Sequence, residues 1–295
     1  MLKFAGTVSA LVLSLLAVPV AAQDAQAVAA RFGALESVQQ ISLSPDGTKV
    51  AYIVPHPTVG TVVKVADLTT GESKQVIASH GKDEQVYWCG WSSDIRLVCK
   101  IYIVYNNAGQ LLGFTRAYAL DADGNNVVML SASTSGRVSG VMQSGGDVID
   151  WDVSNKPDTV LMTRAFVGQD RRDSNIASEK PGWGVEEVDT RSVKRRTVEH
   201  ARTDAVEYIS DGHGNVRILG TISSDAGGYL RNKLKYYYRK LDSRDWQELS
   251  KVDINAVGLG GFTPYAVDSK RNVVYGFDDR DGRQHCTASR STAHL

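Results

Sequence analysis

Two kinds of polar turn alternate along this chain, and this alternation restricts its fold more than any other feature. The turns separate short segments in which apolar and polar residues alternate, as they do in strands that bury one face. Turns of the first kind begin at Ser44, Ser92, Ser154, Asp211 and Asp268, and turns of the second kind begin at Leu68, Asp121, Asp189 and Asp242. Equivalent turns are 48 to 68 residues apart. The pattern predicts a four-stranded unit that is repeated along the chain.

A repeat of four strands every ~40–50 residues is typical of a β-propeller blade, and loop insertions account for the longer spacings. A β-sandwich also consists of short strands, but it would not repeat the same two turns in the same order. The sequence therefore favours an all-β fold, an incomplete β-propeller domain at residues 37–284. We predict four complete blades and the start of a fifth at Gly261, the complete blades being residues 37–79, 84–131, 147–200 and 204–251.

The first residues have the order of a secretory signal peptide. Lys3 supplies a positive charge, a mainly apolar run extends from Phe4 to Val20, and Ala22 ends a possible cleavage site. A membrane anchor is the alternative, but the run is short for a span of ~20 residues and the cleavage site follows at once. We predict a signal peptide at residues 1–22, a short Ala-rich helix and lead-in at residues 23–36, and export to the periplasm or the medium.

The charge and the cysteine content limit the possible partners of the chain and the cellular compartment in which it works. The chain has 33 basic and 33 acidic residues, so nothing attracts it in bulk to nucleic acid or an anionic membrane, and no stable membrane span is expected after cleavage. Cys89 and Cys99 flank a predicted hairpin turn. If they lie directly opposite each other they can form a disulfide, which export favours, whereas a slip of one residue forbids it. Two small buried thiols are the alternative.

The sequence predicts no catalytic residue, no cofactor and no metal site. It contains no Gly-x-Ser-x-Gly motif, the nucleophile turn of α/β-hydrolases. The residues that could take part in catalysis or metal binding have simpler explanations. His56, His80, His200 and His213 lack the spacing of metal ligands, and Asp121–Asn125 starts like a calcium loop without the Glu that closes one. Glu186 and Glu187 are candidates to bind a substrate amine, but on a strand they point to opposite faces.

Two segments of the chain resemble the start of bacterial prolyl-oligopeptidase-like serine peptidases, of the acylaminoacyl-peptidase and dipeptidyl-peptidase type. One runs from Arg31-Phe32-Gly33-Ala34-Leu35 to the turn within Ile41–Tyr52, and the more specific one is the hairpin Cys89–Cys99. The resemblance covers roughly residues 1–284. It implies a propeller that limits access to a C-terminal α/β-hydrolase domain with a Ser-Asp-His triad. No position of this sequence matches that triad, so none of its residues is carried over.

The last residues, 285–295, have a different pattern from the strands before them. They lack alternation and contain an isolated cysteine, Cys286. A single base lost near the codon for Gln284 would explain the change, because the other frame permits an alternating strand followed by an Asp-Gly turn. Under this hypothesis the residues are an aberrant, frameshifted tail.

These observations lead to one functional hypothesis and one alternative. The hypothesis is an N-terminal, substrate-gating propeller fragment of an exported peptidase, which lacks the catalytic domain and is no enzyme by itself. Its expected partners are peptides or a separately encoded catalytic domain. The alternative is a free-standing periplasmic propeller that binds proteins or peptides.

Overall fold

Every regular element in the described part of the chain is a β-strand. The computed structural model describes residues 36–81, 83–132, 142–167, 181–224, 230–255, 258–280 and 283–289. Its strands form five antiparallel sheets, in each of which the strands follow their order in the chain or its reverse. The predicted signal peptide and the predicted Ala-rich helix lie outside the described residues.

The first two sheets have four strands each. The first consists of β1 (Gln40–Leu43), β2 (Lys49–His56), β3 (Gly60–Asp67) and β4 (Ser73–Ala78). The second consists of β5 (Glu84–Ser93), β6 (Arg96–Asn107), β7 (Gln110–Asp121) and β8 (Val128–Met129).

The other three sheets differ in their number of strands. The third consists of β9 (Val148–Asp150), β10 (Thr159–Phe166), β11 (Gly182–Asp189) and β12 (Arg195–Arg202). The fourth consists of β13 (Ala205–Ser210), β14 (Val216–Ser224), β15 (Leu230–Tyr238), β16 (Gln247–Asn255) and β17 (Gly258–Gly260). The fifth consists of β18 (Thr263–Asp268), β19 (Val273–Arg280) and β20 (Arg283–Ser289).

The prediction of an all-β chain with repeated four-stranded units is confirmed, and the sheets are of the kind that form propeller blades. Each predicted turn lies between the strands that it was expected to join. The turn that begins at Ser44 shows why such turns are readable from sequence. Gly47 has a φ of 73°, which glycine adopts without strain, and the Asp46 carboxylate accepts hydrogen bonds from Ser44 and Thr48.

The expectation that the strand pattern ends at Gln284 is wrong. Residues 283–289 form β20, which pairs continuously with β19 from Arg280↔Arg283 to Val274↔Ser289. Antiparallel pairing uses backbone groups, so an edge strand with mostly exposed side chains does not need alternation. The same reason explains β17, which pairs with β16 without an alternating sequence. The frameshift hypothesis itself is not tested by this pairing and stays a prediction.

The core is divided into layers between consecutive sheets. Four clusters of buried side chains lie between the first and second, second and third, third and fourth, and fourth and fifth sheets. Neighbouring residues of one strand serve different layers. Val160 packs toward the second sheet and Leu161 toward the fourth, while Leu219 packs toward the third sheet and Ile218 toward the fifth. The inner sheets therefore bury both faces, which is how blades pack in a propeller.

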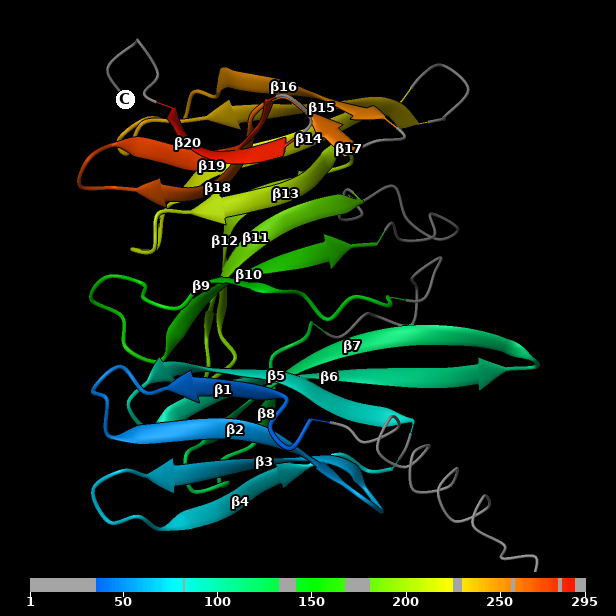
Figure 1. The fold of residues 1–295 in the computed structure, drawn as a ribbon, viewed down its shortest axis with the longest axis vertical. Helices are drawn as coiled ribbons and strands as arrows, with labels where there is room; N and C mark the ends of the chain where they lie inside the picture. The colour runs from blue at the N-terminus through cyan, green and yellow to red at the C-terminus, as the bar shows by residue number, and fades with distance from the viewer. Residues whose placement is uncertain are drawn as a thin grey trace, which may run out of the picture. The chain divides into compact units, whose positions relative to one another are not determined.

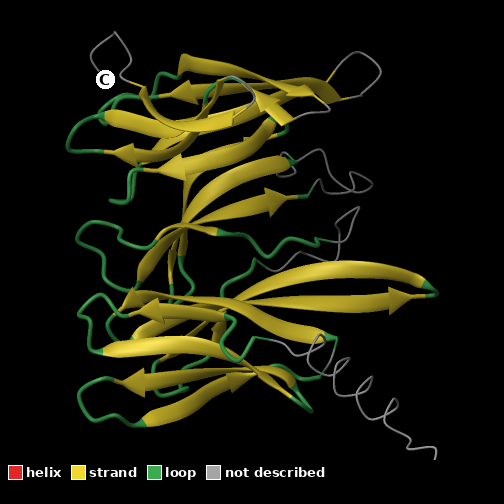
Figure 2. Cartoon of the chain, in the orientation of Figure 1, coloured by secondary structure: helices red, strands yellow, loops and turns green. Residues whose placement is uncertain are grey.

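The described sheets form a row rather than a closed ring. Figure 1 shows the first sheet at one end, and the fourth and fifth sheets overlapping in the view at the other. Figure 2 shows that turns and loops alone connect the strands in the described part of the chain. Each pair of neighbouring sheets has its own junction, and the junction between the first two contains the disulfide.

Candidate functional site

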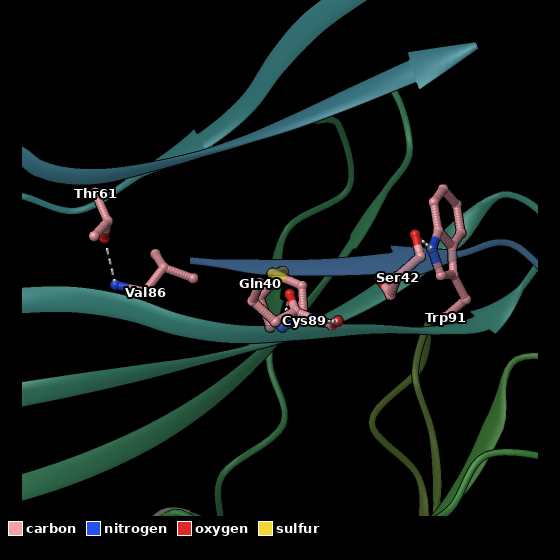
Figure 3. The surroundings of a disulfide bond; sticks show 7 residues. Gln40, Ser42, Thr61, Val86, Cys89 and Trp91 are labelled. Carbon is pink, nitrogen blue, oxygen red and sulfur yellow. Dashed lines mark hydrogen bonds between the residues drawn. A yellow bond between two sulfur atoms is a disulfide. The ribbon is translucent and has the colours of Figure 1, made fainter. Parts of the chain in front are cut away.

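The junction between the first and second sheets contains the disulfide (Figure 3). The pairing of β5 with β6 brings Cys89 directly opposite Cys99, with 4.1 Å between their Cα atoms, and the two residues form a disulfide. This is the register on which the predicted disulfide depended. Both cysteines are fully buried.

Gln40 joins the backbone of the disulfide hairpin to the first sheet. Its amide Nε2 donates to the carbonyl oxygen of Cys89 at 2.9 Å, and the backbone N–H of Cys89 donates to its Oε1 at 3.2 Å. β1 and β5 are both end strands of their sheets. A carboxamide has one donor and one acceptor side, so it satisfies a strand edge as another strand would. Sequence reasoning missed this residue, because nothing local distinguishes Gln40 from another polar strand residue.

Two further hydrogen bonds cross the same junction. The indole Nε1 of Trp91 donates to the Ser42 carbonyl at 3.1 Å, and the backbone N–H of Val86 donates to Thr61 Oγ1 at 2.8 Å. Trp91 is only 5% exposed. Trp91 is therefore buried, and its indole joins the hairpin to the first sheet rather than facing a substrate.

Arg96 connects the second sheet to the third sheet, on the side away from the first sheet. Its side chain is fully buried, and it donates to Asp121 Oδ1 at 2.9 Å, to the Asn126 carbonyl at 2.9 Å and to the Thr190 carbonyl of the third sheet's turn at 2.5 Å. Arg191 pairs with the same Asp121 at 3.0 Å. Burial opposes ionisation of Asp121, but hydrogen bonds from Asn126 and Arg96 and the charge of Arg191 bring its pKa below the ordinary value.

The described histidines lie apart from one another and close to solvent. His56 Nδ1 contacts Thr58 Oγ1 of its own turn at 3.1 Å, and His80 Nδ1 contacts Glu84 at 3.1 Å with its side chain 87% exposed. His213 Nδ1 lies 3.9 Å from Asp152, and His200 is exposed. Among the residues that the structure describes, no three His, Cys, Asp or Glu side chains are grouped to hold a metal ion.

The carboxylates that sequence analysis considered have protein partners. Asp123 closes its own turn by accepting from the backbone and side chain of Asn125. The adjacent glutamates lie on opposite faces of β11, as alternation predicts. Each contacts two basic side chains: Glu186 contacts Arg164 and Arg195, and Glu187 contacts Lys156 and Arg196. Neither glutamate presents an uncompensated charge to a substrate amine.

An open groove of ≈ 750 Å³ lies at the turn end of the first two sheets. Its walls carry both charges as well as apolar side chains, namely Lys49, Val65, Asp67, Glu72, Ser73, Lys74, Ile95, Asp121, Ala122 and Asp123. Its volume is in the range of small-molecule sites, which is about 300–1,000 Å³.

Asp150 is a buried acid whose titration we expect to be measurable. It is 3% exposed and accepts from the backbone N–H groups of Gly214 and Asp152. Burial raises its pKa above the ordinary value of 3.8, despite these hydrogen bonds. The folded state therefore binds this proton more tightly than the unfolded state, so the stabilising contribution is present at low pH and is lost as pH rises through the folded pKa.

Asp150→Asn is expected to reduce the loss of stability that sets in as pH rises above the ordinary aspartate pKa of 3.8. Urea unfolding at a series of pH values measures this, and the difference between variant and wild type should grow with pH. Asp152→Asn is the matched control, because the Asp152 side chain is 76% exposed. Parallel pH profiles of wild type and Asp150→Asn would contradict the prediction.

The described residues include no helix that is long and apolar enough to cross a membrane. No protein-family model matches the chain, and no curated protein matches it. Solved structures do match, among them propeller-containing peptidases of the acylaminoacyl and prolyl type. The β-propeller domain of the Trilobed protease from Pyrococcus furiosus is 15% identical, with 87% of this chain and 68% of that chain covered and a TM-score of 0.44.

Two further solved structures are similar over most of this chain. An acylaminoacyl peptidase in complex with Z-Gly-Gly-Phe-chloromethyl ketone is 15% identical, with 88% of this chain covered and a TM-score of 0.45. The chain spans 38% of the length of that peptidase. TolB from Acinetobacter baumannii is 14% identical, with 85% of this chain and 51% of that chain covered and a TM-score of 0.36. These are similarities of fold.

Proposed function

We propose that this chain is the propeller part of an exported serine peptidase of the prolyl-oligopeptidase type, the part that limits which peptides reach the catalytic domain. The observation that carries the proposal is the hairpin Cys89–Cys99, the most specific segment of the sequence resemblance. In the structure its Trp91 contacts the first sheet and its Arg96 contacts the third sheet's turn. Two residues of this hairpin thus join consecutive sheets.

The proposal assigns no catalysis to these residues by themselves. An α/β-hydrolase places its nucleophile on a strand-to-helix turn and activates it with a histidine. The sequence has no Gly-x-Ser-x-Gly motif. A catalytic domain, in the same polypeptide or encoded separately, is the partner that the proposal requires.

Export is part of the proposal and has two supports. The first 22 residues have the order of a signal peptide. The Cys89–Cys99 disulfide is of the kind that persists in oxidising compartments such as the periplasm.

A second candidate function is a free-standing periplasmic module that binds peptides or proteins. The groove at the turn end of the first two sheets favours it, because Lys49, Lys74, Asp67 and Glu72 offer both charges to a peptide. In this case binding occurs without turnover and without a catalytic partner.

One experiment in a bacterial host tests the proposed function. The full chain is produced with its own N-terminus, and we expect the periplasmic fraction to contain protein that begins at Gln23. This protein should release no product from aminoacyl or dipeptidyl chromogenic substrates and should not react with a serine-directed fluorophosphonate. Turnover that the inhibitor abolishes, or retention of the chain in the cytoplasm with an intact leader, would overturn the proposal. Saturable peptide binding to the chain alone would favour the second candidate.

A further inference from the structure

The hairpin of β6 and β7 extends beyond the rest of the second sheet (Figures 1 and 2). β5 pairs with β6 only as far as Glu84↔Ile103, and β8 pairs with β7 only at Tyr118 and Ala119. We call residues Ile103–Phe114 the arm. Over its length the two strands pair with each other in an unbroken register from Ile103↔Phe114 to Asn107↔Gln110. A two-stranded hairpin alone is marginally stable in water, so this length needs a further contact.

The arm lacks the usual protections of an exposed hairpin. From Ile101 to Thr115 the sequence contains no Asp, Glu, Lys, Arg or Pro. Its pairing shows no bulge. Charges, prolines and bulges are the devices by which proteins keep exposed strands from associating. Their joint absence indicates that the arm is a surface for association.

One face of the arm is an apolar quartet. Tyr105 lies opposite Leu112, and Ile103 lies opposite Phe114, two residues further from the tip. Residues two apart on a strand share a face, so all four side chains lie on one face. Tyr105 is 57% exposed and the other three are half-buried. The quartet is therefore in contact with water at its outer end.

The opposite face is partly covered by the arm itself. Tyr102 lies against Gly113, so closely that a Cβ on this glycine would collide with the Tyr102 ring. Leu111, on this face, is 68% exposed and lies opposite the polar Asn106 near the tip. The quartet is thus the contiguous apolar surface, and Leu111 provides a matched position outside it.

We propose that the quartet binds the quartet of a second copy of this chain, so that two arms pack face to face in a dimer. The aromatic residues Tyr105 and Phe114 occupy one diagonal of the quartet, and the aliphatic residues Ile103 and Leu112 occupy the other. The two copies can be related by a two-fold axis that lies in the plane of contact, either along the arm or across it. Each of these axes places every aromatic ring of one copy on an aliphatic side chain of the other copy. The surface is therefore self-complementary, as an isologous interface requires, and no like charges meet.

The strand edges favour a second copy over a lipid surface. From Tyr105 to Leu112 the outer backbone groups of β6 and β7 have no neighbouring strand among the described residues. In a face-to-face dimer water still hydrates these edges. In the apolar part of a bilayer, the same backbone groups would have no water to bind and would stay unpaired.

Sedimentation equilibrium of the purified chain tests the dimer. Four side chains form an interface smaller than the ~1,200 Å² of stable complexes, so we expect a reversible dimer that is populated at concentrations on the order of 100 µM. Leu112→Lys is expected to weaken association by about tenfold or more, because it buries a charge against an aromatic side chain of the second copy. Leu111→Lys adds the same charge on the other face and should leave association unchanged. A monomer at all concentrations, or an equal effect of both variants, overturns the proposal.

Chemical cross-linking gives a measurement that depends less on affinity. In a Cys286→Ser background, a short bismaleimide should trap Leu112→Cys as a covalent dimer, because the two introduced thiols lie at adjacent corners of the contact, and Leu111→Cys should remain a monomer. Circular dichroism shows whether each variant keeps its strand content. Trapping at Leu111→Cys alone contradicts the proposed face. Flotation of the wild-type chain with phosphatidylcholine/phosphatidylglycerol vesicles, abolished by both lysine variants, would assign the arm to a lipid surface and overturn the dimer.

Discussion

Arg96→Ala is expected to lower the free energy of unfolding by about 3–5 kcal/mol, the cost of removing one partner from a buried ion pair. The Arg96 side chain is fully buried against Asp121. It also donates to the carbonyls of Asn126 and Thr190, which lie in different sheets' turns. The variant loses these donors and leaves space where the guanidinium packed. Equilibrium unfolding in urea, followed by tryptophan fluorescence, measures the change.

Arg191→Ala is the matched control, because Arg191 pairs with the same carboxylate of Asp121 from a more exposed position. Its side chain is 40% exposed, compared with 0% for Arg96. Exposed pairs contribute at most about 1 kcal/mol, so this variant should remain close to wild type. Equal losses for the two arginines would show that burial does not decide the effect.

Replacing both Cys89 and Cys99 with alanine is expected to lower the free energy of unfolding by about 2–3 kcal/mol. The bond closes a loop with a sequence separation of 10, and the chain-entropy relation predicts a stabilisation of about that size. Reduction of the wild type should produce a similar loss. The alanine variant should not respond to reductant, so unfolding with and without dithiothreitol isolates the bond.

Cys286 provides the control for the disulfide. It is an exposed free thiol in β20, so Cys286→Ser should leave stability unchanged. Alkylation of the unreduced chain should add one label, and reduction in denaturant should raise the total to the 3 cysteines of the sequence. Three labels without reductant would refute the disulfide.

Local interactions explain which parts of the fold could be predicted from sequence. Asp46 is an example, because hydrogen bonds from Ser44 and then Thr48 lower its pKa to about 2, all within one turn. Such turns are specified by residues that are close in sequence, so their positions and the four-stranded repeat could be predicted. The register of the Cys89–Cys99 hairpin remained open, because it depends on how the strands around Trp88 and Trp91 shift past one another.

The edges of the sheets could not be predicted for a different reason. β20 and β17 are held by backbone hydrogen bonds, and the backbone carries no sequence signal. The arm was also missed as a projecting element. Its alternation resembles that of any other hairpin, and only the shorter extent of β5 and β8 leaves it uncovered.

The turns could be read from the amino-acid sequence, as could the four-stranded repeat and a cysteine pair that can bond, because these features depend on neighbouring residues and on a strand period of two. The junctions between sheets are visible only in the folded chain. Gln40 meets Cys89 at a separation of 49 residues, and Arg96 meets Thr190 at a separation of 94. Partners at such distances are selected by which sheet faces pack together, and packing depends on the whole set of buried side chains rather than on any segment of the chain.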